Sequence, residues 1–139
     1  MRAGASRLDT RPTRFLLVGV TGVGVNTIVL WGATQAGGLP TLLGGVLASL
    51  TSTFTNFLLN DIFTWRDRRS ASWRVKAIRM LRYYGTTAAG NLIYLAVLTV
   101  LTQRLGLFVL AANLVAIGVG GTFNYVLHNL WTWRRGERG

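Results

Sequence analysis

Four long apolar segments limit what this chain can fold into. A helix that crosses a bilayer needs about 20 mostly apolar residues, and four segments meet this requirement: residues 15–36, 42–63, 83–102 and 107–131. Half of the 139 residues are hydrophobic and only 14% are charged, which is typical of membrane proteins. Because lipid cannot hydrogen-bond to the backbone, such segments span it as helices. The sequence therefore predicts an all-α integral membrane protein with one membrane domain over residues 1–139.

The basic residues indicate how these spans are oriented. Of the 15 Lys and Arg residues, four precede the first span, seven lie in the connector 66–82 and three follow the last span, while only Arg104 lies on the other side. Loops on the cytoplasmic side carry an excess of Lys and Arg. Both termini and the basic connector are thus predicted to be cytoplasmic, in a multi-pass protein of the cytoplasmic membrane. A cleaved signal peptide is not favoured, because the first span exceeds the ~7 to 15 residues of a signal's apolar region and no clear cleavage motif follows it.

The composition argues against several functional classes. The positive charge lies between apolar segments and not on one polar face, so no nucleic-acid partner is predicted. The chain has no Cys and a single His, His128, so no metal site is expected. The segment GVTGVGVN (19–26) lacks the spacing of a dinucleotide loop and follows no strand. No cofactor is predicted, and without a nucleophile and base pair an enzyme is not expected.

The second and fourth spans end in nearly the same letters. NFLLNDIFTWR (56–66) recurs as NYVLHNLWTWR (124–134), so that Asn56 matches Asn124 at an offset of 68 in the numbering. Two spans per half make both halves enter the membrane in the same direction, which predicts two parallel two-helix repeats related by an axis along the membrane normal. In each half, the residues at every fourth position form a stripe that consists of three small residues followed by two polar ones. The stripe is Gly44, Ala48, Ser52, Asn56 and Asn60 in one half, and Ala112, Ala116, Gly120, Asn124 and His128 in the other.

A weaker match relates the first and third spans at an offset of 65. It predicts that these two helices also correspond. The pairs are Arg14 with Arg79, Leu16 with Leu81, Thr21 with Thr86, Asn26 with Asn91, and Ile28 with Ile93.

The polar residues of the endings are the candidate binding residues. Close helix packing explains the Gly, Ala and Ser positions of the stripe. Amides can also cross-link helices in lipid for about 0.6 to 2 kcal/mol, so a structural role stays open beside a binding role. The recurrence of Asn56, Asn60, Asn124 and His128 on one stripe in both halves favours a shared polar site.

Asp61 is the only acidic residue near a predicted span. Ionisable residues inside spans tend to be functional. Asp61 is also close in sequence to Arg66, however, so a paired structural carboxylate is an equal alternative. Its counterpart Asn129 is uncharged, which argues against a mechanism that uses two carboxylates.

Aromatic residues and arginines follow the polar positions. Phe63, Trp65, Trp131 and Trp133 fit an interfacial aromatic belt. A guanidinium group binds phosphate through paired hydrogen bonds, so a basic collar around a polar interior suits an anionic lipid headgroup. The arginines expected at headgroup level are Arg14, Arg66, Arg79, Arg82 and Arg134.

The basic connector has a helical period of its own. Its apolar positions are Trp73, Ala77, Met80 or Leu81, and Tyr84, opposite Arg74, Lys76, Arg79 and Arg82. Such a pattern is typical of a helix that lies on an anionic leaflet. A docking surface for a partner enzyme is the alternative.

These segments resemble the GtrA-like family, which comprises small four-span proteins associated with bactoprenol-linked glucose translocation. The resemblance rests on RFLLVGVTGVGVN (14–26) and the two endings, and it covers residues 14–134. It implies movement of a polyprenyl-phosphate-linked sugar, or of polyprenyl phosphate itself, across the cytoplasmic membrane for cell-surface polysaccharide synthesis. Members usually carry a basic residue where this chain has Asp61, so a phosphate role does not carry over to that position. The substrate-binding candidates are Arg14, Asn26, Asn56, Asn60, Asp61, Arg66, Arg79, Asn91, Asn124, His128, Asn129 and Arg134.

Other functions stay open. A non-transporting membrane adaptor could anchor or recruit a glycosyltransferase through the basic connector. A small cation exporter fits the size but needs a carboxylate in its first span, which has none. A homo-oligomer is an open alternative, because Gly19, Gly22 and Gly24 permit close packing.

Overall fold

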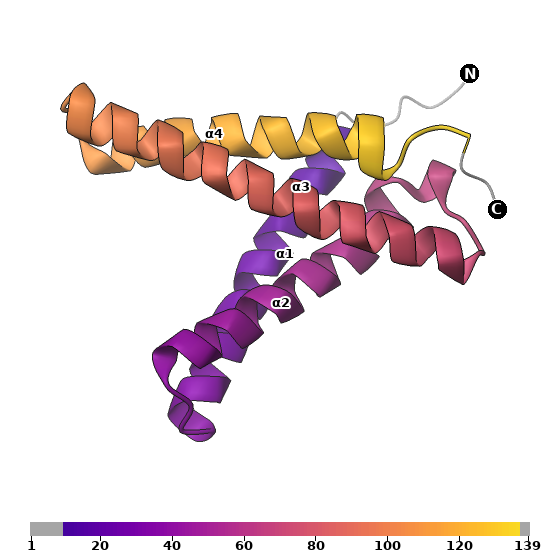
Figure 1. Cartoon of the computed structure of the whole chain (residues 1–139), viewed down its shortest axis with the longest axis horizontal. Coiled ribbons are helices and arrows are strands. Elements are labelled where there is room, and N and C mark those ends of the chain that lie inside the picture. The colour runs from indigo at the N-terminus through magenta and orange to yellow at the C-terminus, as the bar shows by residue number, and fades with distance from the viewer. Residues whose placement is uncertain (1–9, 137–139) are drawn as a thin grey trace, which may run out of the picture. The chain divides into compact units, whose positions relative to one another are not determined.

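The computed structural model describes residues 10–136 as four long helices joined into two hairpins (Figure 1). All four helices are long and apolar enough to cross a membrane. The predicted all-helical fold is therefore confirmed, with four helices able to span a membrane. The helices are α1 (Arg11–Trp31), α2 (Thr41–Leu59), α3 (Trp73–Thr99) and α4 (Val109–Leu127).

Each long helix is extended by one π-helical turn. These turns are η2 (Gly32–Ala36), η3 (Asn60–Thr64), η5 (Val100–Arg104) and η6 (His128–Thr132). A short 3-10 turn, η4 (Arg66–Arg68), follows η3. Pro12 lies in the first turn of α1, where its missing N–H has no helical partner to lose.

The chain divides into two compact units, which we call hairpin 1 (Met1–Arg69, with α1 and α2) and hairpin 2 (Ser70–Gly139, with α3 and α4). Each hairpin turns at a glycine in the left-handed region, Gly38 with φ 64° and Gly106 with φ 63°. Only glycine adopts this conformation without steric cost. Three of the basic residues counted in the charge bias, Arg2, Arg7 and Arg138, lie outside the described residues.

Helix α3 begins at Trp73, within the segment that the sequence assigned to the connector. Residues 73–82 contain neither Gly nor Pro, so nothing in them breaks the helix. The helical pattern of the connector therefore belongs to the first part of α3. Trp73 at its start is 80% exposed.

Small residues bring the two helices of each hairpin close together. Ala48 of α2 and Ala116 of α4 have no exposed surface. The Ser52 hydroxyl donates a hydrogen bond to the Gly22 carbonyl oxygen over 2.8 Å. In lipid, where hydrophobic burial does not drive helix pairing, such close approach supplies packing and polar contacts. The packing explanation of the small-residue stripe is confirmed.

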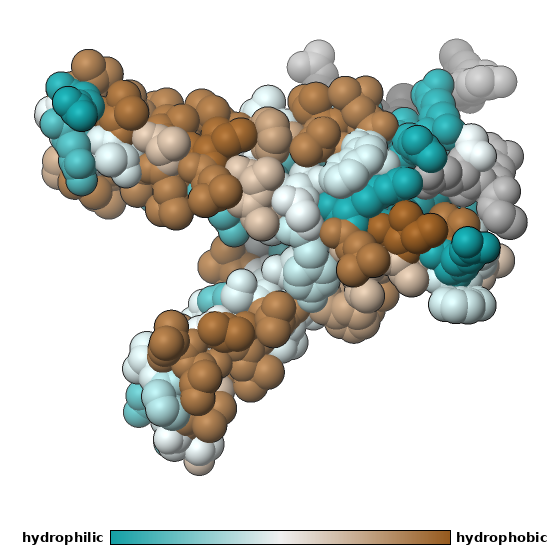
Figure 2. Space-filling view, in the orientation of Figure 1, coloured by the Kyte–Doolittle hydropathy of each residue, from teal (hydrophilic) through white to brown (hydrophobic). Residues whose placement is uncertain are grey.

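The outward surface of both hairpins is apolar. Leu42 of α2 is 79% exposed and Leu114 of α4 is 72% exposed. Figure 2 shows hydrophobic side chains along the hairpins, with hydrophilic residues gathered at their ends. Helices with satisfied backbones and this apolar cover suit a hydrocarbon environment.

Several contacts of hairpin 1 recur in hairpin 2 at an offset of 68. Phe15 meets Trp65 edge-on with ring centroids 5.8 Å apart, and Tyr83 meets Trp133 in the same way at 5.7 Å. This offset is the one that the endings of the second and fourth spans predicted, and it holds for α1 and α3 as well.

The predicted offset of 65 for the first and third spans is therefore wrong. The guanidinium of Arg14 lies over one aromatic ring of its hairpin and that of Arg82 lies over the corresponding ring of the other, so Arg14 corresponds to Arg82 and not to Arg79. The error has a physical cause. Leu16 and Leu81, which supported the match, are both largely exposed, and an outward face that only has to be apolar carries no information on register.

Candidate functional site

Hairpin 1 closes in a buried cluster of polar and aromatic side chains where α2 ends. Asn60 is 1% exposed and Thr64 has no exposed surface. The Thr64 hydroxyl donates to Asn60 Oδ1 over 2.6 Å, across the π-helical turn η3. We call this group, with the exposed Phe63 ring at its edge, end cluster 1; its members are Arg14, Phe15, Asn60, Asp61, Phe63, Thr64 and Trp65.

Aromatic rings close end cluster 1. Trp65 is fully buried and packs edge-on against Phe15 of α1. The guanidinium of Arg14, itself only 8% exposed, lies 5.7 Å from the centre of the Phe63 ring. A cation over an aromatic face is attracted by the ring quadrupole. The cluster thus ties the start of α1 to the end of α2.

Hairpin 2 closes in the same way but around an imidazole. His128, 1% exposed, stacks on Tyr83 with centroids 4.3 Å apart and planes within 9°. Its Nδ1 is 2.9 Å from the hydroxyl oxygen of Thr132. Trp133 packs edge-on against both rings at 5.7 Å. We call this group end cluster 2; its members are Arg82, Tyr83, His128, Asn129, Trp131, Thr132 and Trp133.

An exposed arginine directly follows each end cluster. Arg66 comes after Trp65 and Arg134 comes after Trp133, and both are exposed. The other predicted headgroup arginines are placed differently. Arg14 and Arg79 are buried, and Arg79 is only 1% exposed. Of the candidates, Arg66 and Arg134 are the ones whose side chains reach the surface.

Arg82 is held within hairpin 2. Its guanidinium lies 5.8 Å from the centre of the Trp131 ring and donates to the Trp131 carbonyl oxygen over 3.4 Å. In hairpin 1, Arg11 pairs with Asp67 over 2.7 Å. The open ends of both hairpins are therefore rich in positive charge that is partly engaged by neighbouring groups.

Deeper in each span, one amide of the stripe faces a glycine of the partner helix. A Cβ atom at Gly22 would collide with the Asn56 amide, and one at Gly90 would collide with that of Asn124. The Oδ1 atoms of Asn56 and Asn124 are shielded from solvent and have no hydrogen-bond partner among the described residues. A buried acceptor without a donor costs about 1 to 3 kcal/mol. Each of these two oxygens packs against the glycine that it faces and is an acceptor that no described group satisfies.

The remaining candidates are spread over the hairpins. Asp61 is buried in end cluster 1, and Asn129 is half-buried in end cluster 2. Asn26 is half-buried, whereas Asn91 is exposed, so the two predicted counterparts do not share an environment. Among residues 10–136, no group of three or more His, Cys, Asp or Glu residues stands together as a metal site would require.

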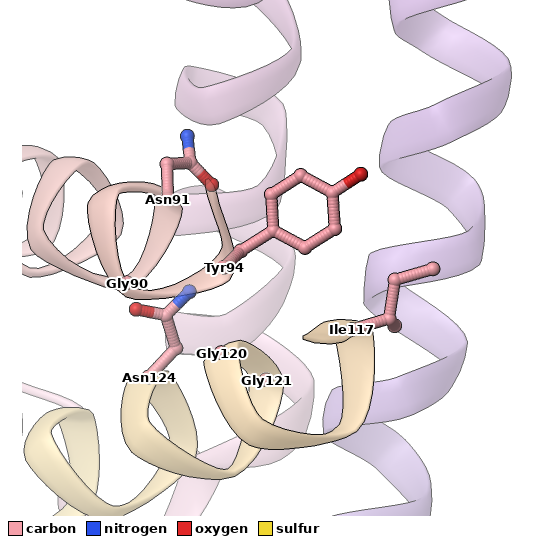
Figure 3. Close-up of a pocket in the computed structure, with 7 residues that line it drawn as sticks. All are labelled: Gly90, Asn91, Tyr94, Ile117, Gly120, Gly121 and Asn124. Carbon is pink, nitrogen blue, oxygen red and sulfur yellow. The ribbon is translucent and has the colours of Figure 1, made fainter. Parts of the chain in front are cut away.

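A pocket of about 290 Å³ opens between α3 and α4 beside Asn124. Figure 3 shows the Asn124 side chain directed from α4 toward Gly90 on α3. The hydroxyl of Tyr94, which belongs to α3, donates a hydrogen bond to Asn113 Oδ1 of α4 over 2.7 Å. The lining residues are Gly90, Asn91, Tyr94, Ile117, Gly120, Gly121 and Asn124.

Sequence reasoning missed several residues of these sites. Tyr83, Tyr94 and Gly90 were not singled out as site residues. Applying the offset of 68 to the first and third spans would have paired Tyr83 with Phe15 and Gly90 with Gly22. The two glycines face the two stripe amides in the structure. In the sequence, the glycine pair and the amide pair share the offset of 68, and this was the signal that could have identified them.

Known proteins are similar to this chain in sequence. A curated relative, the dolichol-phosphate mannosyltransferase of Pyrococcus furiosus, is 32% identical over 123 residues, which are 88% of this chain and 34% of that protein. The chain thus spans 34% of the relative's length. The family described as GtrA/DPMS, transmembrane domain, matches residues 14–138, which include both end clusters. The family resemblance found in the spans and their endings is confirmed: the chain belongs to the GtrA/DPMS transmembrane-domain family.

Proposed function

We propose that this protein moves a polyprenyl-phosphate-linked sugar, or polyprenyl phosphate, across the cytoplasmic membrane. One observation carries the proposal. In each hairpin, an exposed arginine follows a buried polar cluster, and deeper in the same helix lies an amide oxygen that no described group hydrogen-bonds. A lipid headgroup that leaves water needs polar contacts in this order, because an unpartnered polar group in hydrocarbon is costly.

Arg66 and Arg134 would capture the phosphate. Both are exposed, and a guanidinium fork matches phosphate oxygens in charge and geometry. From Arg134, Asn124 lies ten positions earlier in the chain, or about 15 Å along a helix. That distance is about half of the ~30 Å hydrocarbon thickness. The polar positions of one helix therefore extend from the headgroup level to the middle of the span.

The driving force would come from the lipid gradient. The four predicted spans contain a single carboxylate, Asp61, and the sequence shows no phosphate-binding loop for a nucleotide. We therefore propose facilitated movement without covalent chemistry, in which the isoprenoid tail stays in lipid along the apolar outer surface of the hairpins.

The proposed orientation places both end clusters on the cytoplasmic side. The open ends of the hairpins carry Arg11, Arg66, Arg74, Lys76 and Arg134, whereas Arg104 lies near the opposite end of hairpin 2. By the excess of basic residues in cytoplasmic segments, both hairpins enter from the cytoplasm as parallel repeats. Both termini would then be cytoplasmic.

Reconstituted protein tests the proposal. Liposomes containing the chain should move labelled polyprenyl-phosphate glucose between leaflets faster than empty liposomes. Arg134→Gln and Arg66→Gln should each slow this movement about tenfold, because a charged hydrogen bond contributes about 1.5 to 3 kcal/mol. Arg69→Gln is the matched control, since Arg69 is also exposed but follows neither cluster directly. Equal rates for Arg134→Gln and wild type would contradict the assignment of phosphate capture.

A second candidate function is an adaptor for a glycosyltransferase. The observation that favours it is that the chain is similar to a segment that makes up 34% of a mannosyltransferase, so in that relative such a segment belongs to a glycosyltransferase. Trp73 and Arg74, exposed at the start of α3, offer a contact surface. Arg74→Glu with Lys76→Glu should then abolish co-purification with the enzyme and leave lipid movement unchanged. Arg79, which the sequence grouped with them, is buried and is left intact.

A further inference from the structure

Helix α3 is longer than its partner in hairpin 2. With its π-helical turn it covers 32 residues, Trp73–Arg104, whereas α4 with its turn covers 24, Val109–Thr132. Tyr83 packs against Trp133 directly after α4 ends, and α3 continues beyond that contact through residues 73–82 (Figure 1). We call residues 73–82 the α3 start; they extend about 15 Å along the helix axis.

The apolar face that α3 presents outward continues through the α3 start. Leu81 is 71% exposed, and Leu92, about three turns further along the helix, is 68% exposed. Trp73 and Ile78 are exposed as well. In water this apolar surface would stay unburied, which is unfavourable. The face therefore indicates contact with lipid along the whole of α3, including the part that precedes end cluster 2.

An exposed basic side chain lies on this face. Arg74 precedes Leu81 by seven residues, or about two turns, which puts both on one side of the helix. The sequence pattern placed Arg74 opposite the apolar positions of the connector, and the structure corrects this. Lys76 beside it is half-buried. The apolar face of α3 thus ends in positive charge.

The neighbouring chain supplies no countercharge for these two cations. Residues 68–136 contain no Asp or Glu, and the preceding carboxylate, Asp67, pairs with Arg11 over 2.7 Å. A negative surface that touches both the apolar face and the cations would satisfy Arg74 and Lys76. The headgroup layer of a leaflet with acidic phospholipids has this chemistry.

The length of α3 suits a tilted crossing of the whole bilayer. A helix of 32 residues is about 48 Å long, and a bilayer with its headgroups is ~40 to 45 Å thick. Membrane helices tilt by ~0 to 40°, and a tilt of about 20 to 30° reduces 48 Å to about 42 to 45 Å. In that geometry the α3 start lies within the headgroup layer, with Leu81 toward the hydrocarbon and Arg74 toward the phosphates.

We propose that the α3 start binds acidic phospholipids in the leaflet that contains end cluster 2. Trp73 is the side chain that prefers the interface. The attraction of an anionic surface for each Lys or Arg near it corresponds to about fivefold in affinity. This lipid binding does not depend on transport. The occupant differs from the enzyme of the adaptor function, which would use the same residues.

A fluorophore placed on the α3 start tests the proposal in vesicles. Because the chain has no Cys, Ile78→Cys can carry a single bimane label on the full-length protein. The probes are phosphatidylglycerol and phosphatidylcholine, each with a nitroxide near the glycerol that quenches bimane on contact. The ratio of quenching by phosphatidylglycerol to that by phosphatidylcholine should exceed one. Arg74→Gln and Lys76→Gln should each lower this ratio about two- to fivefold, since salt screens part of the attraction.

Two controls use the same helix. Arg104→Gln removes an exposed cation at the opposite end of α3 and should leave the ratio at position 78 unchanged. Bimane on Leu92→Cys, an exposed site within the span, should be quenched by nitroxides deep in the acyl chain and show no headgroup preference. Both leaflets of the vesicles have one composition, so the orientation of the protein does not affect the result.

Three results would overturn the proposal. The first is equal quenching of the label at position 78 by the two lipids, and the second is a ratio that Arg74→Gln and Lys76→Gln leave unchanged. The third is a label that neither lipid quenches, which would leave the α3 start to a protein partner, as the adaptor function requires. If the preference for phosphatidylglycerol is present but the liposomes show no lipid movement, translocation fails and the lipid-binding α3 start stands.

Discussion

Hairpin 1 and hairpin 2 share a geometry but differ in their polar chemistry. The edge-on ring pair, the cation over an aromatic ring and the hydrogen bond across the last helical turn occur in both, each at the same offset of 68. Yet Asn60 of one cluster is replaced by His128 in the other, and Asp61 by Asn129. The contacts that close a hairpin are thus kept, while the groups that a headgroup would meet have diverged.

The helix-to-helix hydrogen bonds show the same division. Hairpin 1 uses Ser52 against the Gly22 carbonyl, in the middle of the packing face. Hairpin 2 uses Tyr94 with Asn113, which are nearer the turn of the hairpin. In hairpin 2, Gly120 faces the Gly90 carbonyl oxygen and Tyr94 of α3 at close range. The two hairpins therefore use different residues at different depths to link their helices, while both keep the same closing contacts.

The buried tryptophans should give the largest effect when removed. Trp65→Ala and Trp133→Ala each delete a ring with no exposed surface, and such deletions cost about 3 to 5 kcal/mol. If the end clusters are equivalent, the two variants should lower the midpoint of thermal unfolding in detergent by similar amounts. Trp73→Ala is the control, because Trp73 is 80% exposed and its removal should leave the midpoint unchanged. A large loss in only one of the two buried variants would break the equivalence.

The glycines that face the stripe amides should give the next largest effect. Gly22→Val and Gly90→Val place a branched side chain against Asn56 and Asn124, and overpacking of this kind costs about 1 to 3 kcal/mol. Both should unfold at lower temperature than the wild type. The control is Gly85→Val, since Gly85 of α3 faces open space. Equal stability of Gly85→Val and Gly90→Val would show that α3 and α4 do not meet at Gly90.

Much of the fold could be predicted from the sequence. Four apolar segments of sufficient length fix the number of spans, because lipid permits little else. The stripe Gly44, Ala48 and Ser52 indicated the packing face correctly, since small residues at helical spacing have few other uses in a membrane. Identical residues did not reveal which positions of α1 and α3 correspond, because Leu16 and Leu81 lie on exposed faces where any apolar residue is tolerated.

The candidate sites were only partly readable. The endings of α2 and α4 identified Asn60 and His128. Some of the rings that pack in these clusters come from α1 and α3, however, and a pattern in a single sequence does not show which helices meet. Tyr83 stacks on His128 from α3, and no motif joins the two. Gly90 and Gly120 bring α3 and α4 close together beside the pocket, and the sequence alone does not show which group a glycine in a span faces.

Smaller effects should separate the two helix-to-helix hydrogen bonds. Ser52→Ala removes the bond to the Gly22 carbonyl and Tyr94→Phe removes the bond to Asn113, each at a cost of about 0.6 kcal/mol, the average for such bonds in membranes. The double variant should lose the sum, because the two bonds share no residue and the contributions of independent sites add. Thermal unfolding of both single variants and the double variant measures this. A loss in the double variant that clearly exceeds the sum would show that the hairpins are coupled through these bonds.

The ion pair between Arg11 and Asp67 should give the smallest effect, and its two positions do not form an ion pair in hairpin 2. The corresponding residues there are Arg79 and Arg135, which carry like charges. Asp67 is 52% exposed and Arg11 is 26% exposed, so solvent and salt screen the attraction, and Asp67→Asn should cost about 0.5 kcal/mol or less. The stability difference from the wild type should shrink further as NaCl is raised. If Asp67→Asn destabilised the chain by as much as Trp65→Ala, the pair would belong to the buried framework of hairpin 1, and the two hairpins would be closed by different interactions.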